Sequence, residues 1–301
     1  MVAVGFGVLI GPLGLGLVDL SQWGDPLSII EQVARLTIAI AVTSIALRLP
    51  QNYFRKRAKA MATILGPGMI AMWLVSGLVV YVILGFPVWV ALLVGAIVTP
   101  TDPVLANTIV TGEAAEENIP ERLRNVLSGE SGANDGGAYP LVFLAILMLT
   151  RSTETALVEW LTRTLLWEVG AAIALGLVVG VAIGRAERFA SSERFLEKTS
   201  VLTVTVALTF AALGFIKLLG SDGILGVFVA GLAYNYVAVS SDEAEEQQIQ
   251  EVVNRLFTFP AFVLFGMMIP WSAWVGLGWR GVAVVVAVLL LRRLPMLFAL
   301  R

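Results

Sequence analysis

The chain has 301 residues, of which 58% are apolar and 14% are charged, and its formal net charge at pH 7 is −2. A soluble domain typically carries about 25% charged residues, so this composition excludes an ordinary soluble domain and predicts a polytopic membrane protein. The near-balanced charge argues against nucleic acid as a partner. The chain contains no Cys and no His, which removes thiol and Ser-His chemistry, zinc sites built on those residues and histidine proton relays. Any transferred proton must therefore be carried by Asp or Glu, and we expect a transporter, not an enzyme.

Ten apolar segments follow one another along the chain, and most approach the ~20 residues that a helix needs to cross a bilayer. They are Met1–Val18, Val33–Leu49, Ala62–Leu84, Pro87–Ile109, Ser128–Leu149, Leu165–Ile183, Ser200–Leu219, Ile224–Val239, Leu256–Pro270 and Gly281–Arg301. These segments predict an all-α fold of about ten transmembrane helices. Because no low-complexity linker divides them, we expect one integral-membrane domain over residues 1–301.

The connections between these segments differ in basic content. If the spans alternate, one side holds most of the arginines and lysines, including the run Arg55–Lys59. Basic connections stay cytoplasmic, so we expect a cell-membrane protein with Met1 and Arg301 on the cytoplasmic side. The chain stops within an apolar run, Leu297–Arg301, so we also expect it to be a piece of a longer protein.

The fourth segment is interrupted by Thr99-Pro100-Thr101-Asp102-Pro103. Each proline lacks an N–H and disfavours helix for the residue before it, which predicts extended backbone at Thr99 and Asp102. One half-helix should end near Val98, and the next should begin at Pro103 with Asp102 as its N-cap. Non-helical backbone at membrane depth is tolerated where it lines a cavity, as at the substrate sites of transporters. The alternative is that the prolines only kink the helix and Asp102 only caps it.

The fifth segment begins with polar residues that are costly in a bilayer. An Asp at mid-membrane costs about 2.5 to 3.5 kcal/mol, so an ionisable residue there is a functional-site hypothesis. In a helix, Glu130 and Asn134 lie four residues apart on one face, and Ser131 and Asp135 form a second such pair. The glycines between them allow another backbone to approach closely.

Arg292 and Arg293 fall near the middle of the last predicted span. A guanidinium at that depth cannot lose its charge and should find a carboxylate, for which Glu130 is the natural candidate, with Arg293 as its partner. The alternative is a tilted or shorter span that leaves one arginine at the interface.

These residues predict a division of labour between two carboxylates. Glu130, paired with Arg293, stays ionised as a structural ion pair. Asp135 has no evident cation, so it can hold either a proton or a small monovalent cation, and exchange then needs only alternating access. Asp102, Ser131, Asn134 and the backbone of Thr101 supply further oxygens, which suit Na⁺ or Li⁺ bound at Asp135 and Asp102. No cofactor is expected beyond these transported ions.

Two other functional classes remain open from the residues alone. A cation channel gated by the cytoplasmic connections is one, although the chain has no Thr-Val-Gly-Tyr-Gly filter. An intramembrane protease that uses Asp102 and Asp135 is a remote second.

Several motifs resemble the NhaP-type sodium/hydrogen exchanger branch of the monovalent cation/proton antiporter family. They are Gly7–Pro12, Thr101–Pro103, Glu130–Ser131 with Asn134–Gly136, Asp222–Leu232 and the late Arg293, in family order across nearly the whole chain.

The resemblance implies a thirteen-span fold with two inverted repeats, two crossing broken helices and a homodimer. It implies that Asp135 binds the cation or proton with Asp102 beside it, and that Glu130 pairs with Arg293 and is linked to Asn134. Members with Asn before the binding Asp resemble electroneutral exchangers, so Asn134 points to one-for-one exchange. On this match the first and the last two spans, one of them the second broken helix, are missing from the chain.

Overall fold

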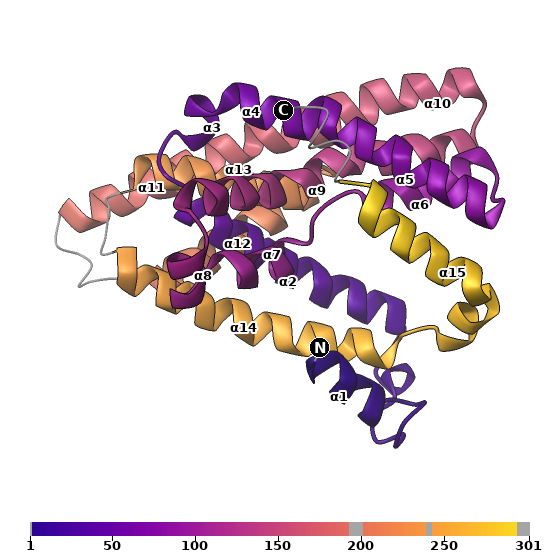
Figure 1. The fold of residues 1–301 in the computed structure, drawn as a ribbon. Helices are drawn as coiled ribbons and strands as arrows, with labels where there is room; N and C mark the ends of the chain where they lie inside the picture. Colours follow the sequence, from indigo (N-terminus) through magenta and orange to yellow (C-terminus); the bar gives the residue numbers. More distant parts are fainter. Residues whose placement is uncertain (1, 193–200, 239–242, 294–301) are drawn as a thin grey trace.

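A computed structural model describes residues 2–192, 201–238 and 243–293 (Figure 1). In these ranges the chain is built from helices and connecting turns and contains no strand. The helices are α1 (Val2–Ile10), η1 (Leu20–Gln22), α2 (Pro26–Arg48), α3 (Tyr53–Lys56), α4 (Ala58–Thr63), η2 (Ile64–Gly68), α5 (Met69–Leu84), α6 (Val88–Val98), α7 (Pro103–Val110), α8 (Glu113–Asn118), α9 (Glu121–Thr150), α10 (Thr153–Glu159), η3 (Trp160–Ala171), α11 (Ala172–Ser192), α12 (Val201–Leu218), α13 (Gly223–Val237), α14 (Glu243–Met267) and α15 (Trp271–Leu291).

Six helices among the described residues are long and apolar enough to cross a membrane. Two of them are composite. The helix Ala58–Leu84 joins α4, η2 and α5, and Thr153–Phe189 joins α10, η3 and most of α11. Both extend beyond the predicted segments Ala62–Leu84 and Leu165–Ile183. Shorter apolar helices occupy Val206–Leu218, Gly223–Val237 and Val252–Met267.

The first predicted span, Met1–Val18, is wrong as a single helix. α1 ends at Ile10, and its nine residues extend only about 14 Å at 1.5 Å per residue. Pro12 and the positive φ of Gly16 (64°) lie in the turn that follows. α1 packs against α14 through glycines, because a Cβ at Gly7 would lie 2.0 Å from the Val263 carbonyl oxygen.

The last predicted span, Gly281–Arg301, is also displaced. α15 begins at Trp271, is kinked at Gly278 (φ 55°, ψ −143°) and ends at Leu291. Arg292 and Arg293 therefore follow the helix instead of lying in its middle. The rest of the predicted span, residues 294–301, lies outside the described residues.

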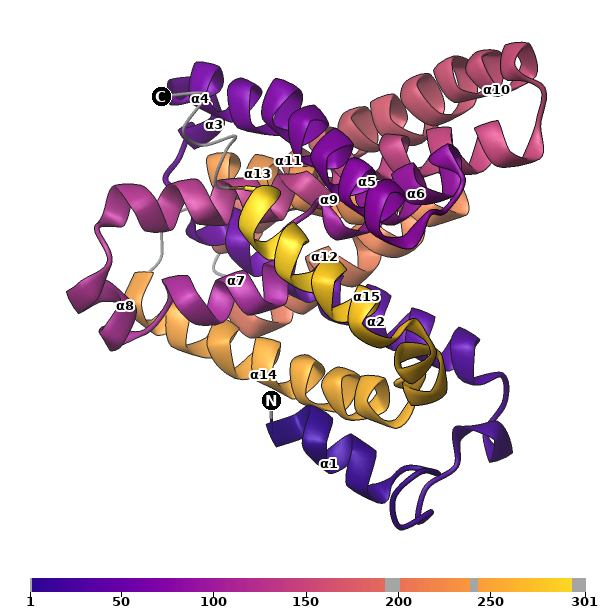
Figure 2. The ribbon, with the colours of Figure 1, turned by 45° about the vertical axis from the view of Figure 1, so that its right-hand side comes forward.

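α13 lies at the centre of the helix packing and contacts α11, α2, α12 and α9 (Figure 2). Its Val227, Phe228 and Ala230 are almost completely buried. α13 carries small residues on several faces, so its neighbours approach its backbone closely. A Cβ at Gly180 of α11 would lie 2.2 Å from the Ala230 carbonyl oxygen.

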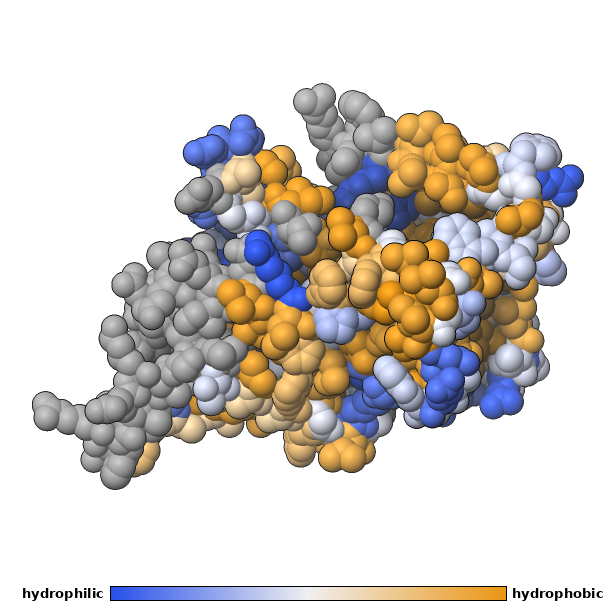
Figure 3. Space-filling view, turned by 90° about the horizontal axis from the view of Figure 1, so that it is seen from below, coloured by the Kyte–Doolittle hydropathy of each residue, from blue (hydrophilic) through white to orange (hydrophobic). Residues whose placement is uncertain are grey.

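Large apolar side chains remain exposed on the outer helices. Figure 3 shows a face on which such side chains predominate. On α15, Val275, Val282 and Leu289 are each at least two-thirds exposed (78%, 66% and 68%). Exposed apolar surface on this scale is typical of a surface that faces lipid or other helices.

Candidate functional site

The break between α6 and α7 is formed as the proline spacing predicts. α6 ends at Val98, and α7 begins at Pro103 with Asp102 as its N-cap in non-helical backbone (φ −55°, ψ 116°). Asp102 Oδ1 accepts hydrogen bonds from the amides of Val104 (2.8 Å) and Leu105 (3.3 Å).

Thr99 differs from the prediction, because it keeps helical backbone (φ −69°, ψ −46°) despite the following proline. Its hydroxyl donates to the Gly95 carbonyl at 2.7 Å, and its amide donates to the Ala96 carbonyl at 3.3 Å. The effect of a proline on the preceding residue is a preference, and these two bonds hold Thr99 in the last turn of α6. The break is therefore confined to the residues after Thr99.

α9 carries the polar stretch as a continuous helix through the molecule. Glu130, Ser131 and Asn134 are buried, with exposures of 2%, 0% and 1%, whereas Asp135 is only partly buried. The link between Glu130 and Asn134 that the resemblance implies is wrong for this structure, since both polar atoms of the Asn134 side chain lack a hydrogen-bond partner. The Ser131 hydroxyl donates to the Ser128 carbonyl (3.2 Å).

Arg293 joins α9 to the break. It forms an ion pair with Glu130, and its Nη1 donates to the Thr101 hydroxyl at 2.7 Å. The Thr101 hydroxyl in turn donates to Glu130 Oε1 at 3.3 Å. Arg292 donates to the carbonyl of Val98, at the end of α6. The two arginines therefore contact the end of α6 and the break that follows it.

Asp135 is in a different electrostatic environment. Within the described part of the chain, no hydrogen bond or ion pair reaches its carboxylate, and the charged groups that act on it are Asp102 and Asp222. The structure thus brings Asp102 and Asp135 into electrostatic contact. It brings Thr101 to Glu130 and Arg293, and the Thr101 hydroxyl bonds to those residues.

Asp222 was missed as a site residue by the sequence reasoning. It caps α13 as Asp102 caps α7, with its Oδ1 accepting from the amides of Ile224 (3.0 Å) and Leu225 (3.2 Å). The sequence did contain a signal for Asp222, because Ser221–Leu225 has the same residue pattern as Thr101–Leu105. In both segments a hydroxyl residue is followed by Asp, then by Pro or Gly, an aliphatic residue and Leu.

Glycines on α9 bring Asp222 towards Asp135. A Cβ at Gly136 would lie 2.6 Å from Leu225 Cδ1, and a Cβ at Gly132 would lie 2.3 Å from Phe228 Cε2. Only a residue without a side chain fits against α13 at these positions. The start of α13, with its Asp222 cap, is thereby held beside the Asp135 turn of α9.

Pro140 adds a further oxygen near Asp135. It lies inside α9 and has no N–H, so it cannot donate to the carbonyl of Gly136, four residues earlier. That carbonyl, next to Asp135 in the sequence, is free of its usual helical partner and can accept a bond from water or a cation. In the sequence, the position of Pro140 four residues after Gly136 was the signal for this free carbonyl.

The chain is similar in sequence and in fold to several known proteins. The Na(+)/H(+) antiporter 2 of Zygosaccharomyces rouxii is 34% identical over 311 residues, which cover 100% of this chain and 38% of that protein. The Na(+)/H(+) antiporter of Saccharomyces cerevisiae is 34% identical over 305 residues, covering 98% and 31% respectively. The chain thus spans well under half the length of these relatives. The sodium proton antiporter MjNhaP1 from Methanocaldococcus jannaschii, solved at pH 8, shares the fold with a TM-score of 0.72 at 19% identity, over 99% of this chain and 71% of that one.

The sequence profile of the family described as "Sodium/hydrogen exchanger, transmembrane" matches residues 1–301. The match runs over the broken helix, the polar turn of α9 and the arginines that join them. The chain therefore belongs to the sodium/hydrogen exchanger family.

Proposed function

We propose that the chain carries the ion-binding core of a secondary transporter that exchanges Na⁺ for H⁺ across a membrane. The observation that carries this proposal is the contrast between two carboxylates on neighbouring turns of α9. Glu130 is neutralised by Arg293, while no cation contacts Asp135 among the described residues. The names of the two yeast relatives, each a Na(+)/H(+) antiporter, support it.

In this mechanism the Asp135 carboxylate binds either a proton or Na⁺ but not both. Each ion neutralises the same charge, so the second would find no counter-charge. Asp102 supplies a second carboxylate, and Ser131 and the Thr101 backbone supply further oxygens. Asn134 has a buried amide oxygen and nitrogen without partners. A buried polar group left unpaired costs about 1–3 kcal/mol, and an ion or its water shell at this site would satisfy it.

One ion of each kind moves per cycle, because a single carboxylate is exchanged between them and Asn134 adds no charge. The proposed exchange is therefore electroneutral, with Na⁺ or Li⁺ as cargo and no resident cofactor. Alternating access at the break would open the site to each side in turn. Membership of the exchanger family favours this function over a channel or an intramembrane protease.

We further propose that the protein works as a homodimer in the cell membrane, for sodium and pH homeostasis. The side rich in Arg and Lys, around Arg55–Lys59, is proposed to be cytoplasmic, with Met1 and Arg301 on that side. The excess of basic residues in these connections supports the orientation, and the family resemblance supports the dimer.

The decisive experiment measures ion-driven proton flux in liposomes that contain the full-length protein, comparing Na⁺, Li⁺ and K⁺. Asp135→Asn is expected to abolish exchange while the protein still inserts. Asp25→Asn is the matched control, because Asp25 caps α2 at an exposed turn and Asn caps helices about as well as Asp. Full activity of Asp135→Asn would refute the role of this carboxylate, and wild-type current without proton counter-flow would favour a channel.

A further inference from the structure

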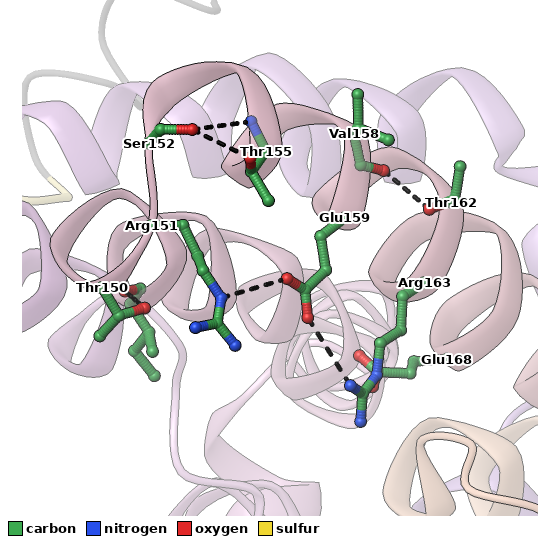
Figure 4. A network of polar contacts seen from close by, with 10 residues as sticks. Thr150, Arg151, Ser152, Thr155, Val158, Glu159, Thr162, Arg163 and Glu168 are labelled. Carbon is green, nitrogen blue, oxygen red and sulfur yellow. Dashed lines mark hydrogen bonds and ion pairs between the residues drawn. The ribbon is translucent and has the colours of Figure 1, made fainter.

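A chain of ion pairs leads from the surface at the end of α9 into the molecule (Figure 4). Glu159 contacts Arg151 Nε at 3.6 Å and Arg163 Nη1 at 3.6 Å, and Arg163 Nε contacts Glu168 Oε1 at 3.2 Å. Side-chain exposure falls from 69% at Arg163 to 7% at Glu168. A buried carboxylate therefore lies directly behind an exposed guanidinium.

The local helix geometry creates this contact. Arg163 and Glu168 lie in η3, which is a π-helix over Trp160–Ala171. Its i→i+5 hydrogen bonding places residues five apart above one another, and such segments are frequent at functional sites. Glu168 uses only Oε1 in the pair. Its buried Oε2 accepts no hydrogen bond of normal length and angle in the described ranges, although the Tyr139 phenol lies close enough to interact with the carboxylate.

Glu168 is tied by its backbone to the start of α13. Its carbonyl oxygen accepts hydrogen bonds from the Asp222 amide (2.9 Å) and from the Ser221 hydroxyl (2.9 Å). The carboxylates of Glu168 and Asp222 interact electrostatically, and Asp222 also acts on Asp135. The Tyr139 phenol, one turn of α9 beyond Asp135, lies close to the Glu168 carboxylate. Glu168 and Asp222 thus connect the surface arginine to the proposed exchange site.

In this cluster, solvent screens the two acids, Glu168 and Asp222, much less than it screens the cations that face them. Both buried members, Glu168 and Asp222, are acids with residue exposures of 5% and 7%. The cations that face them, Arg163 and Lys217, are exposed to solvent. Water and salt screen exposed charges far more than buried ones, so the interior of the cluster attracts cations. Ionisable residues at this depth are expensive and typically mark ion pathways.

We propose that Glu168 and Asp222 form a second binding site for a monovalent cation, between the Arg163 surface and Asp135. This inference rests on the proposed exchange function. Arg163 acts as a tethered cation that occupies Glu168 until Na⁺ displaces it, and the ion then passes to Asp135. The site has two carboxylates, and the described residues contain no group of three or more acidic, His or Cys side chains arranged to hold a metal.

The test measures the Na⁺ concentration for half-maximal exchange, K0.5, separately at each face of the membrane. Protein orientation in the liposomes is read with an impermeant thiol reagent on Glu154→Cys, an exposed position near Arg151. Glu168→Gln is expected to raise K0.5 at the Arg163 face by about tenfold, the loss of one charged partner, and to leave K0.5 at the other face unchanged. Arg163→Gln is expected to lower K0.5 at the same face by about two- to fivefold, because an exposed competitor is removed.

The opposite directions separate this site from a structural ion pair. A purely structural pair would make both variants lose stability and activity together, and that result would overturn the proposal. An unchanged K0.5 in Glu168→Gln would overturn it as well. Asp25→Asn is the matched control, since it neutralises an exposed acid that caps α2 and contacts neither Arg163 nor the proposed site, and its K0.5 should equal that of the wild type. If Glu168→Gln fails to fold, Arg163→Gln alone tests the site. It must lower K0.5 at the Arg163 face of the membrane, and an unchanged K0.5 there would overturn the proposal.

Binding of radiolabelled Na⁺ in the Asp135→Asn background tests the site without exchange. Residual binding that disappears on adding Glu168→Gln supports the second site. Absence of residual binding rejects it, whether or not Asp135 proves to be the exchange carboxylate. Conversely, exchange that survives in Asp135→Asn would reject the proposed function while leaving the Glu168 measurement valid.

Discussion

Asp102 accepts two backbone amides through one carboxylate oxygen, so the same side chain caps α7 and carries a charge beside Asp135. On α9, Asn134 is buried with an unpartnered amide, and Asp135 has no counter-cation among the described residues. Unmet polar capacity is therefore concentrated at adjacent positions of α9, and Asp102 adds a second negative charge that acts on Asp135. The informative substitution is therefore one that removes the negative charge of Asp102 and keeps a side chain that caps α7.

Asp102→Asn should separate the two tasks of this residue. Asn is about as good an N-cap as Asp, so thermal stability should stay within ~0.5 kcal/mol of the wild type, whereas Na⁺ affinity should fall because one carboxylate is lost. Asp102→Ala should lose affinity and also about 1 kcal/mol of stability with the cap. The measurements are K0.5 for Na⁺ and the thermal unfolding of the purified protein. Unchanged K0.5 in Asp102→Asn would mean that Asp102 is only a cap.

At the scale of elements, the arginines after α15 hold α9 and the α6–α7 break together. Arg293 contacts both Glu130 and Thr101, while Arg292 contacts the end of α6. Glycines on α9 set the distance to α13 on the opposite side. The proposed exchange site is thus positioned by one polar junction and one apolar junction, and each can be tested alone.

The Glu130–Arg293 pair should behave as one unit. Neutralising one partner of a buried pair typically costs about 3–5 kcal/mol because the other charge is left uncompensated. Glu130→Gln and Arg293→Gln should each reduce folded protein and its thermal stability, and the double variant should recover part of the loss. A double variant no better than the worse single variant would show that the two charges do not stabilise each other.

Gly136→Ala tests the apolar junction. The new Cβ would meet Leu225 at 2.6–3.0 Å, and overpacking of this kind costs about 1–3 kcal/mol. Because the shift occurs next to Asp135, transport should fall together with thermal stability. Gly214→Ala is the control, since Gly214 lies in helix α12 and, in the part of the chain that the structure describes, nothing beyond the adjoining residues and backbone of its own helix lies within 4 Å of the new methyl group. A helical Gly→Ala change in open space should stabilise by about 0.5–1 kcal/mol.

At the scale of the whole molecule, the proposed mechanism makes transport depend on pH, because a proton and Na⁺ compete for one carboxylate. A proton on Asp135 excludes Na⁺, so linkage requires that the apparent K0.5 for Na⁺ rises as pH falls, by up to about tenfold per pH unit. Saturating Na⁺ should overcome the effect. Flux measured against Na⁺ at several pH values checks this, and a K0.5 independent of pH throughout the active range would show that the two ions do not share a site.

The sequence by itself determined the properties that depend on local chemistry. The apolar runs, the absence of Cys and His and the charge balance specified a polytopic helical membrane protein. The proline spacing specified the break at Thr101–Asp102 and the cap on Pro103, because N–H loss and capping act within a few residues. The cost of charge in a bilayer singled out Glu130, Asp135 and the two late arginines. Local rules were less reliable at Thr99, which two hydrogen bonds keep in helical backbone, and at the ends of α1 and α15, which differ from the predicted spans.

The cost of an unpaired charge had already suggested Glu130 as the partner of Arg293, but only the tertiary structure decided the other contacts of the charged groups. It brought Arg293 onto Thr101 as well, from more than 160 positions away in the sequence, left Asn134 without the expected link, and placed Asp222 and Glu168 beside the Asp135 turn. These outcomes depend on how closely helices pack, and that distance is set by glycines on α9 and α11 meeting α13. Electrostatic interactions in a low-dielectric interior depend steeply on such distances, so no spacing along the chain could have specified them.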